Sequence, residues 1–157
     1  MTPSLDDLNP DFRDFLRALV EANVEFVVVG AYALSFHGAP RASGDIDIFV
    51  SPSADNAARL WRALLAFGAP VSAAGLAQAD FTRPDLVYQI GLPPRRVDVL
   101  TSISGVSFEE AWASRVAATV EGHAIHFIGR EMFVRNKLAA GRPKDLADAA
   151  RLEKSPK

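Results

Sequence analysis

Three aspartates stand in two short apolar segments of the sequence. Asp45 and Asp47 alternate with isoleucines at the start of the segment 45–50, and Asp98 lies between two valines in the segment 96–100. Because side chains alternate along a β-strand, a strand in the first segment points both of its aspartates to one face and its apolar residues to the other. Two carboxylates this close repel each other unless a cation, a hydrogen-bond donor or solvent compensates their charge.

Carboxylates at this spacing suit Mg²⁺, which prefers oxygen ligands and commonly takes a few protein carboxylates together with substrate phosphates. By itself, an Asp-x-Asp pattern is more often an exposed strand face that carries two acids. Asp98 favours the metal site, because a solvated charge has no obvious reason to lie in the middle of an apolar strand. If the two strands are neighbours, three carboxylates converge, and we expect two Mg²⁺ ions there, with Mn²⁺ as the alternative metal.

A turn that suits a phosphate group precedes the acids. The β-branched run 25–29 is typical of a buried strand, and it ends at Gly30, where the missing side chain lets the backbone approach a phosphate. Arg41 and Ser43 lie in the Gly- and Pro-rich loop 38–44 and would add a charged and a hydroxyl contact to phosphate oxygens. The plainer interpretation is a structural turn followed by a solvated arginine, and the sequence leaves both open.

Basic residues gather late in the chain. Between residues 130 and 144, five basic side chains face a single glutamate, so this segment is locally positive although the formal net charge of the whole chain is −2. The segment is either a patch that attracts phosphate or a solvated helix face. Arg95 and Arg96 would likewise contact an acceptor nucleic acid or protect an exposed sheet edge.

The hydrophobic pattern predicts an α/β (α+β) chain, with a mixed sheet and helices on one or both of its faces. The expected helices lie near 10–20, 31–37, 54–67, 108–112, 130–140 and 143–152, and the expected strands near 25–29, 45–50, 86–91, 95–100, 116–120 and 124–128. Residues 69–85 fit neither pattern. The last two helices form a C-terminal helical segment.

Length and composition indicate one domain, 1–157, with a core of about 9–152. A chain of 157 residues with 49% hydrophobic content can bury a sizeable core, and no linker or repeat interrupts it. Cysteine is absent, which removes disulfides and thiolate metal sites. No run of about 18 apolar residues could span a bilayer, and the first eight residues carry acids where a signal peptide carries basic charge. We expect a cytoplasmic protein without a membrane partner.

Together these motifs resemble a known superfamily. The order and spacing of Gly30-Ala31, then Asp45-Ile46-Asp47, then Asp98 on a later strand are similar to those of the polymerase-β-like nucleotidyltransferases. More narrowly, the chain resembles small bacterial nucleotidyltransferases akin to the AbiEii-type toxins of toxin and antitoxin pairs, in segments within 32–42, 89–103 and 136–148. The resemblance covers roughly residues 25–152.

The resemblance implies a nucleotidyltransferase fold with a metal site and a phosphate turn. In that fold Asp45, Asp47 and Asp98 hold the metal ions, and Gly30 and Ala31 contact the triphosphate. Ala31 departs from the family pattern, because Gly or Ser is usual at this position, and a missing serine hydroxyl removes one phosphate contact.

The resemblance also implies that a late basic and acidic segment serves the site, made up of Lys137, Arg142, Lys144, Asp145 and Asp148. In this scheme Lys137 joins Arg41 in neutralising phosphate charge. Asp145 or Asp148 would orient a lysine or the acceptor hydroxyl, unless both only cap their helix and compensate its dipole.

The leading hypothesis is a Mg²⁺-dependent enzyme that transfers a nucleoside monophosphate from a nucleoside triphosphate such as ATP to RNA, including tRNA, or to a protein side chain. A toxin and antitoxin role, with a cognate antitoxin or toxin as partner, goes with the AbiEii resemblance. Ala31 keeps open a second hypothesis, a catalytically silent module that binds a nucleotide or a partner. A third is a metal-dependent hydrolase that releases free nucleotide.

Overall fold

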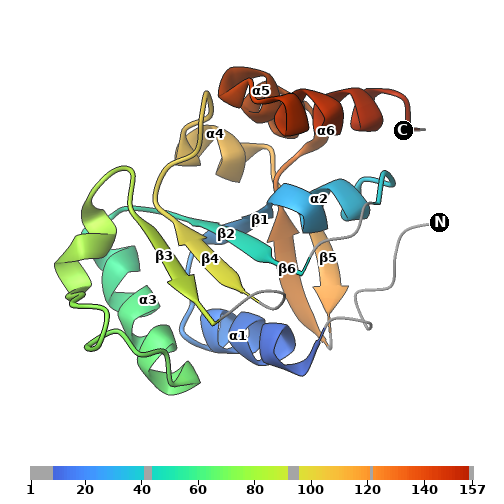
Figure 1. Ribbon diagram of the computed structural model, residues 1–157. Coiled ribbons are helices and arrows are strands. Elements are labelled where there is room, and N and C mark those ends of the chain that lie inside the picture. The colour runs from blue at the N-terminus through green and yellow to red at the C-terminus, as the bar shows by residue number, and fades with distance from the viewer. Residues whose placement is uncertain (1–8, 41–43, 92–95, 121, 156–157) are drawn as a thin grey trace.

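The computed structural model describes residues 9–40, 44–91, 96–120 and 122–155, in which helices and strands are mixed along the chain (Figure 1). The helices are α1 (Pro10–Glu21), α2 (Gly30–Phe36), α3 (Ala54–Phe67), the short 3-10 helix η2 (Gln78–Thr82), α4 (Phe108–Ala113), α5 (Arg130–Ala140) and α6 (Pro143–Glu153). The strands are β1 (Phe26–Val29), β2 (Ile46–Val50), β3 (Val87–Ile90), β4 (Val97–Leu100), β5 (Val116–Val120) and β6 (His123–Phe127).

The strands form one mixed sheet in the order β3-β4-β2-β1-β6-β5. In its middle, β1 and β2 are antiparallel, and each has a parallel neighbour on its other side, β6 beside β1 and β4 beside β2. The outer strands β3 and β5 pair antiparallel with β4 and β6. This order places β2 and β4, the two strands that carry the predicted acid cluster, side by side.

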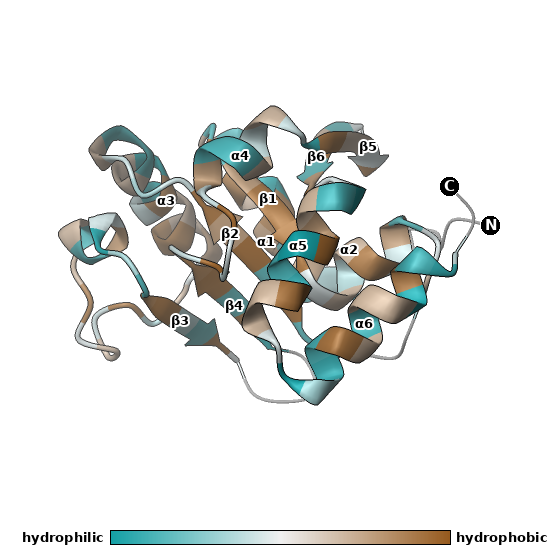
Figure 2. Ribbon diagram, turned by 90° about the horizontal axis from the view of Figure 1, so that it is seen from above, coloured by the Kyte–Doolittle hydropathy of each residue, from teal (hydrophilic) through white to brown (hydrophobic). Residues whose placement is uncertain are grey.

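Helices lie on both sides of the sheet. α1 and α3 pack against each other on one side, whereas α5 and α6 pack against each other beside α2 on the other side (Figure 1). Figure 2 looks onto α5 and α6 with the apolar strands of the sheet behind them. The large side chains between these layers are fully buried, among them Phe12, Phe15, Phe49, Leu60 and Phe127.

Short-range capping sets where the helices begin and end. The Asn9 side chain accepts a hydrogen bond from the backbone N–H of Phe12 (3.1 Å) at the start of α1, and Ser53 caps α3 in the same way. α3 ends at Gly68, which adopts the left-handed conformation (φ 89°) that a residue without a side chain adopts most easily.

Asn56 fastens α3 to the sheet. Its buried side chain accepts a hydrogen bond from the backbone N–H of Glu25 (2.7 Å) and donates to the carbonyls of Glu25 (3.0 Å) and Ser51 (2.9 Å). These bonds satisfy backbone groups just before β1 and just after β2. One amide side chain therefore ties α3 to β1 and β2 at their end opposite the acids.

The predicted α/β fold with a mixed sheet is confirmed. The observed bounds of the helices and strands differ from the expected ones by no more than two residues, and the ambiguous segment 69–85 contains η2. The C-terminal helical segment is also present, with Gly141 ending α5 in the left-handed conformation (φ 71°) and Pro143 starting α6. In the part of the chain that the structure describes, no helix combines the length and apolarity needed to cross a membrane.

Candidate functional site

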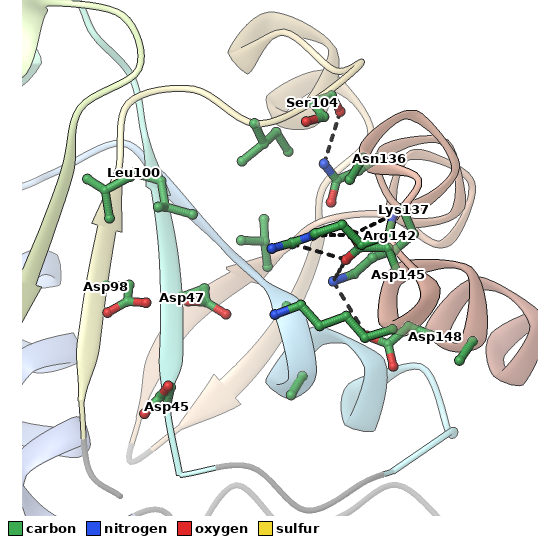
Figure 3. A pocket seen from close by; sticks show the side chains of 18 of the residues that line it. Asp45, Asp47, Asp98, Leu100, Ser104, Asn136, Lys137, Arg142, Asp145 and Asp148 are labelled. Carbon is green, nitrogen blue, oxygen red and sulfur yellow. Dashed lines mark hydrogen bonds and ion pairs between the residues drawn. The ribbon is translucent and has the colours of Figure 1, made fainter. Parts of the chain in front are cut away.

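Asp47 and Asp98 lie directly opposite each other on neighbouring strands. The parallel pairing of β2 with β4 sets Asp47 against Asp98, while the antiparallel pairing with β1 sets Asp47 against Val29, the residue before Gly30. Asp45 lies just before β2 and extends the acidic row. Figure 3 shows the three carboxylates on one side of a cavity, as the alternation of side chains along the strands predicts. We refer to Asp45, Asp47 and Asp98 as the strand acids.

The arginine two residues before Asp98 lies across the strand acids. Arg96 donates through Nε to Oδ1 of Asp98 (2.8 Å) and through one terminal nitrogen to Oδ2 of Asp98 (3.3 Å), and the same terminal nitrogen lies 3.1 Å from Asp45 Oδ2. Its hydrogen bond with Asp98, and then the charge of Asp98, raise the pKa of Arg96. The sequence had suggested that Arg96 contacts an acceptor or protects a sheet edge, and it did not suggest these contacts with Asp45 and Asp98.

The surroundings of Asp47 oppose its ionisation. Burial, then the charge of Asp98 and a hydrogen bond with it, raise the pKa of Asp47 from an ordinary 3.8 to about 6. Lys137 acts in the opposite direction, and the charge of Asp45 adds to the rise. The carboxylate form of Asp47 is therefore under-compensated in the protein alone, which is the situation in which an added cation is favoured.

Gly30 leaves the space that Asp47 occupies. Its backbone adopts φ +67°, a conformation that residues with a side chain rarely adopt, and a Cβ added at this position would collide with Asp47 Oδ2. Ala31 follows in α2 and is buried, with 4% of its surface exposed. The turn and the strand acid are thus fitted to each other, and both border the same cavity.

The cavity has a volume of about 760 Å³. The strand acids line one side of it, and side chains from α5, α6 and the turn between them line the facing side (Figure 3). Arg96 and the turn at Gly30 also line the cavity. The charged side chains from α5, α6 and the turn between them are Lys137, Arg142, Lys144, Asp145, Asp148 and Arg151. Helices that follow the last strand therefore complete a site that begins on β1 and β2.

Two aspartates of α6 are buried in the facing side of the cavity and are paired with bases. Asp145 and Asp148, which we call the helix acids, have 1% and 3% of their surface exposed. Lys137 Nζ lies 3.5 Å from Asp145 and 3.4 Å from Asp148, and Arg142 Nε donates to Asp145 (2.6 Å). Burial alone would raise the pKa of Asp145, but the hydrogen bond from Arg142 and the charges of Lys137 and Arg142 outweigh burial and lower it.

The structure brings most of the predicted site residues to this one cavity. Asp45, Asp47, Asp98, Gly30, Ala31 and all five residues of the late segment line it. Arg41 and Ser43 lie outside the described residues. Lys137 lines the cavity and pairs with both helix acids, with 12% of its side chain exposed, and its predicted role in neutralising phosphate charge stays a prediction. Asp145 does cap its helix, since it accepts from the backbone N–H of Arg142 (3.3 Å), but it is also an ion-pair partner.

Comparison with solved structures identifies the architecture. The solution structure of the antibiotic-resistance factor ANT(2'')-Ia matches with a TM-score of 0.59 and 14% identity, over 90% of this chain and 80% of that chain. A candidate nucleotidyltransferase from Thermotoga maritima gives 0.57 and 17% identity, over 94% of both chains. The lincomycin-bound lincosamide antibiotic adenylyltransferase LnuA gives 0.55 and 13% identity, over 94% and 97%. This chain has the nucleotidyltransferase fold.

Sequence comparisons carry the identification no further. No protein-family model matches the chain, and no curated protein matches it. With identities of 13–17%, the likeness to the solved structures concerns the nucleotidyltransferase fold itself. The closer relationship to AbiEii-type proteins stays a prediction.

Within this nucleotidyltransferase fold, the strand acids have the chemistry of a divalent-cation site. They supply hard oxygen donors from adjacent positions, and burial together with the charge of Asp98 raises the pKa of Asp47. Across the described ranges, no three His, Cys, Asp or Glu side chains already stand around a cation position. In this structure the cation at these acids is the guanidinium of Arg96, which contacts both oxygens of Asp98 and Oδ2 of Asp45. By their chemistry, the same carboxylate oxygens suit a divalent metal ion.

Two contacts that position α5 were not predicted. Asn136 donates to the carbonyl of Ser104 (2.9 Å), and Arg135 donates to the carbonyl of Gly105 (2.8 Å), both in the turn that follows β4. The sequence contains no local signal for them, because they join residues about thirty positions apart. Arg96 did have a signal: it precedes Asp98 by two residues, so the strand period places both side chains on one face.

Proposed function

We propose that this protein is a metal-dependent nucleotidyltransferase that transfers a nucleoside monophosphate from a nucleoside triphosphate to a hydroxyl group of an acceptor. The observation that carries the proposal is the pairing of Asp47 with Asp98 beside the turn at Gly30, at the edge of a cavity with basic side chains opposite. The fold supports it, since among the structural neighbours LnuA is named an adenylyltransferase and one ANT(2'')-Ia structure holds adenylyl-2''-tobramycin.

In this proposal the strand acids hold the divalent cations, Mg²⁺ or Mn²⁺. Bound there, the metal supplies Lewis-acid stabilisation of negative charge on the transferred phosphoryl group and the leaving group. Asp98 would hold the ion on the side of the acceptor hydroxyl. Gly30 and Ala31 would let the triphosphate lie against the backbone, close to Asp47.

The facing side of the cavity suits the anionic parts of the substrates. Five acidic and five basic side chains line the cavity, and four of the five bases come from α5, α6 and the turn between them. Lys137 and Arg142 are partly neutralised by the helix acids, whereas Lys144 is exposed at the rim. The four bases on the facing side favour an acceptor that carries phosphate, such as RNA, over a polycation.

The test is transfer from α-labelled ATP, GTP, CTP and UTP in the presence of Mg²⁺ or Mn²⁺. The acceptors are tRNA, total RNA, a protein lysate, an aminoglycoside and a lincosamide. Asp47→Asn and Asp98→Asn should each lower the transfer rate by at least about 1000-fold, roughly 4 kcal/mol of activation free energy. The matched control is Asp14→Asn, since Asp14 is an exposed aspartate whose partner is Arg17 on α1.

Label on an acceptor that depends on the strand acids and not on Asp14 supports the proposal and also names the acceptor class. Label that survives both substitutions in the strand acids, or that never appears with any of these acceptors, contradicts it. A role in a toxin and antitoxin pair is a narrower proposal, supported by labelled tRNA or by inhibition of the transfer by a cognate partner.

The second candidate is a catalytically silent module that binds nucleotide or a partner. Ala31 favours it, because a methyl group stands where the fold family usually offers a hydroxyl group or no side chain, and Arg96 already lies on the acids. Saturable nucleotide binding without transfer supports this candidate. Release of free nucleotide without an acceptor adduct supports hydrolysis instead.

A further inference from the structure

We propose that Arg96 is the resident counter-cation of the strand acids and that it and a divalent metal ion bind Asp98 in a mutually exclusive way. The inference rests on the metal site of the proposed function, and it assigns a role to a residue outside that site's ligands. Arg96 would then be a positioning residue that holds the acids while no metal is bound and sets how tightly a metal binds.

Arg96 contacts both carboxylate oxygens of Asp98. Its planar group donates to Oδ1 (2.8 Å) and to Oδ2 (3.3 Å), which is the two-point geometry that a guanidinium makes with a carboxylate. The shared terminal nitrogen also reaches Asp45 Oδ2 (3.1 Å). One side chain therefore joins two of the three strand acids through the oxygen atoms that a metal ion would also use.

Charge makes the two cations compete. Asp47 and Asp98 lie opposite each other on neighbouring strands and Asp45 extends the row, so the three carboxylates repel one another unless a cation compensates their charge. A guanidinium left within contact of a divalent ion would repel it, and it would also occupy the carboxylate oxygens that bind it. Metal binding at Asp98 thus requires the guanidinium to move off that carboxylate.

The cavity has room for the guanidinium of Arg96 after it leaves the acids. Arg96 lines the cavity, and 26% of its side chain is exposed, so it can leave the acids without crossing the packed core. A triphosphate in the same cavity is an alternative anionic partner for it. Nucleotide should therefore assist metal binding more in the wild-type protein than in a variant without this guanidinium.

The experiment measures Mn²⁺ binding, by calorimetry and by the resonance signal of free Mn²⁺, with and without a non-hydrolysable ATP analogue. Arg96→Met keeps the aliphatic stem and removes the charge. Arg83→Met is the matched control, because it removes one positive charge from an exposed pair with Asp80, outside the cavity. Arg96→Lys keeps the charge without the two-point contact, and thermal unfolding in EDTA checks that each variant folds.

Arg96→Met should bind Mn²⁺ at least about tenfold more tightly than the wild type, with Arg96→Lys between them and Arg83→Met unchanged. The gain in Mn²⁺ affinity from the ATP analogue should be smaller in Arg96→Met than in the wild type. Equal or weaker Mn²⁺ binding by Arg96→Met overturns the proposal, as does the absence of Mn²⁺ binding in every variant.

The outcome is separable from that of the proposed function. If the affinity order holds but the wild type transfers no nucleotide to any acceptor, the role of Arg96 stands and the enzymatic proposal fails. If transfer is observed but Arg96→Met binds Mn²⁺ no more tightly, the enzyme stands and the role of Arg96 fails.

Discussion

The cavity contains two groups of aspartates, and the pKa of one member of each group is shifted in opposite directions. The helix acids are buried and paired with Lys137 and Arg142, and the pKa of Asp145 is lowered. Two of the strand acids, Asp45 and Asp98, share the guanidinium of Arg96, and burial and the charge of Asp98 raise the pKa of Asp47 to about 6. Both groups have the same side-chain chemistry, so the difference comes from the partners that the fold supplies.

We infer from this difference that the helix acids stabilise the fold, whereas the strand acids are available to bind a cation. A carboxylate whose charge is compensated contributes to stability and has little affinity left for a metal ion. A carboxylate whose charge is under-compensated lowers stability and favours any cation that can reach it. The same substitution, Asp to an uncharged residue, should therefore change stability in opposite directions in the two groups.

The largest effect is expected for Asp145→Ala. The substitution removes the carboxylate that accepts from Arg142 and faces Lys137, so it leaves a nearly buried lysine with one acid and the start of α6 without its cap. The free energy of unfolding should fall by about 3 kcal/mol in urea denaturation at pH 7.

The control for Asp145→Ala is Asp55→Ala. Asp55 lies in the first turn of α3 but is exposed, so this substitution should lower the free energy of unfolding by less than about 1 kcal/mol. If the two variants lose the same amount, the helix acids do not stabilise the fold through their buried pairs.

A smaller loss is expected for Gly30→Ala, through two separable causes. Positive φ disfavours any side chain, and the new methyl group would also collide with Asp47 Oδ2. We expect a loss of about 2 kcal/mol in the free energy of unfolding, measured in the same way.

Gly68→Ala isolates the first cause, because Gly68 has φ +89° and open space around its Cβ position; it should cost about 1 kcal/mol. Combining Gly30→Ala with Asp47→Gly should restore the part of the loss that comes from the collision. An unchanged loss in that double variant would mean that Gly30 and Asp47 are not fitted to each other.

The smallest effect, and the one with the opposite sign, is expected for Asp47→Asn in EDTA. The pKa of Asp47 is raised in the folded protein, so the folded state binds the proton more tightly than the unfolded chain and loses stability as the pH rises from about 4 to above 6. Asp47→Asn should remove that loss and stabilise the protein by about 1 kcal/mol at pH 8.

Thermal unfolding as a function of pH tests this, since the gain from Asp47→Asn should shrink to nothing near pH 4. Asp145→Asn should show the reverse. The pKa of Asp145 is lowered in the folded protein, so its contribution is present at neutral pH and is lost as the pH falls through the acidic range. Parallel pH curves for the two variants would contradict the comparison.

Local patterns predicted the elements and the acids, because both depend on short spacings. The alternation in residues 45–50 placed Asp47 on the face of the sheet that carries the site, and the valines around Asp98 predicted β4. Gly141 and Pro143 marked the break between α5 and α6. Each of these signals lies within a few residues of the feature that it predicts.

The partners of the charged residues depend on which segments meet, and the sequence does not encode that locally. Lys137 lies in a basic segment that suggested a phosphate contact. The packing of α5 against α6 places its ammonium group between two buried acids, with which it forms ion pairs. Arg96 was interpreted as an acceptor contact or as the charge that protects a sheet edge, although the strand period places its side chain on the same face as that of Asp98. Its contact with Asp45 depends on β4 lying next to β2, and no local pattern encodes that strand order.

The sequence positions of the two sides of the cavity have a consequence for synthesis on the ribosome. Residues that form the acidic side are complete at Asp98, whereas the basic side begins at Asn136, about 40 residues later. At translation rates of roughly 5–20 residues per second, several seconds can separate the emergence of the two. Arg96 is made two residues before Asp98, so a nascent chain contains the cation that contacts Asp98 before any of the basic side has been made.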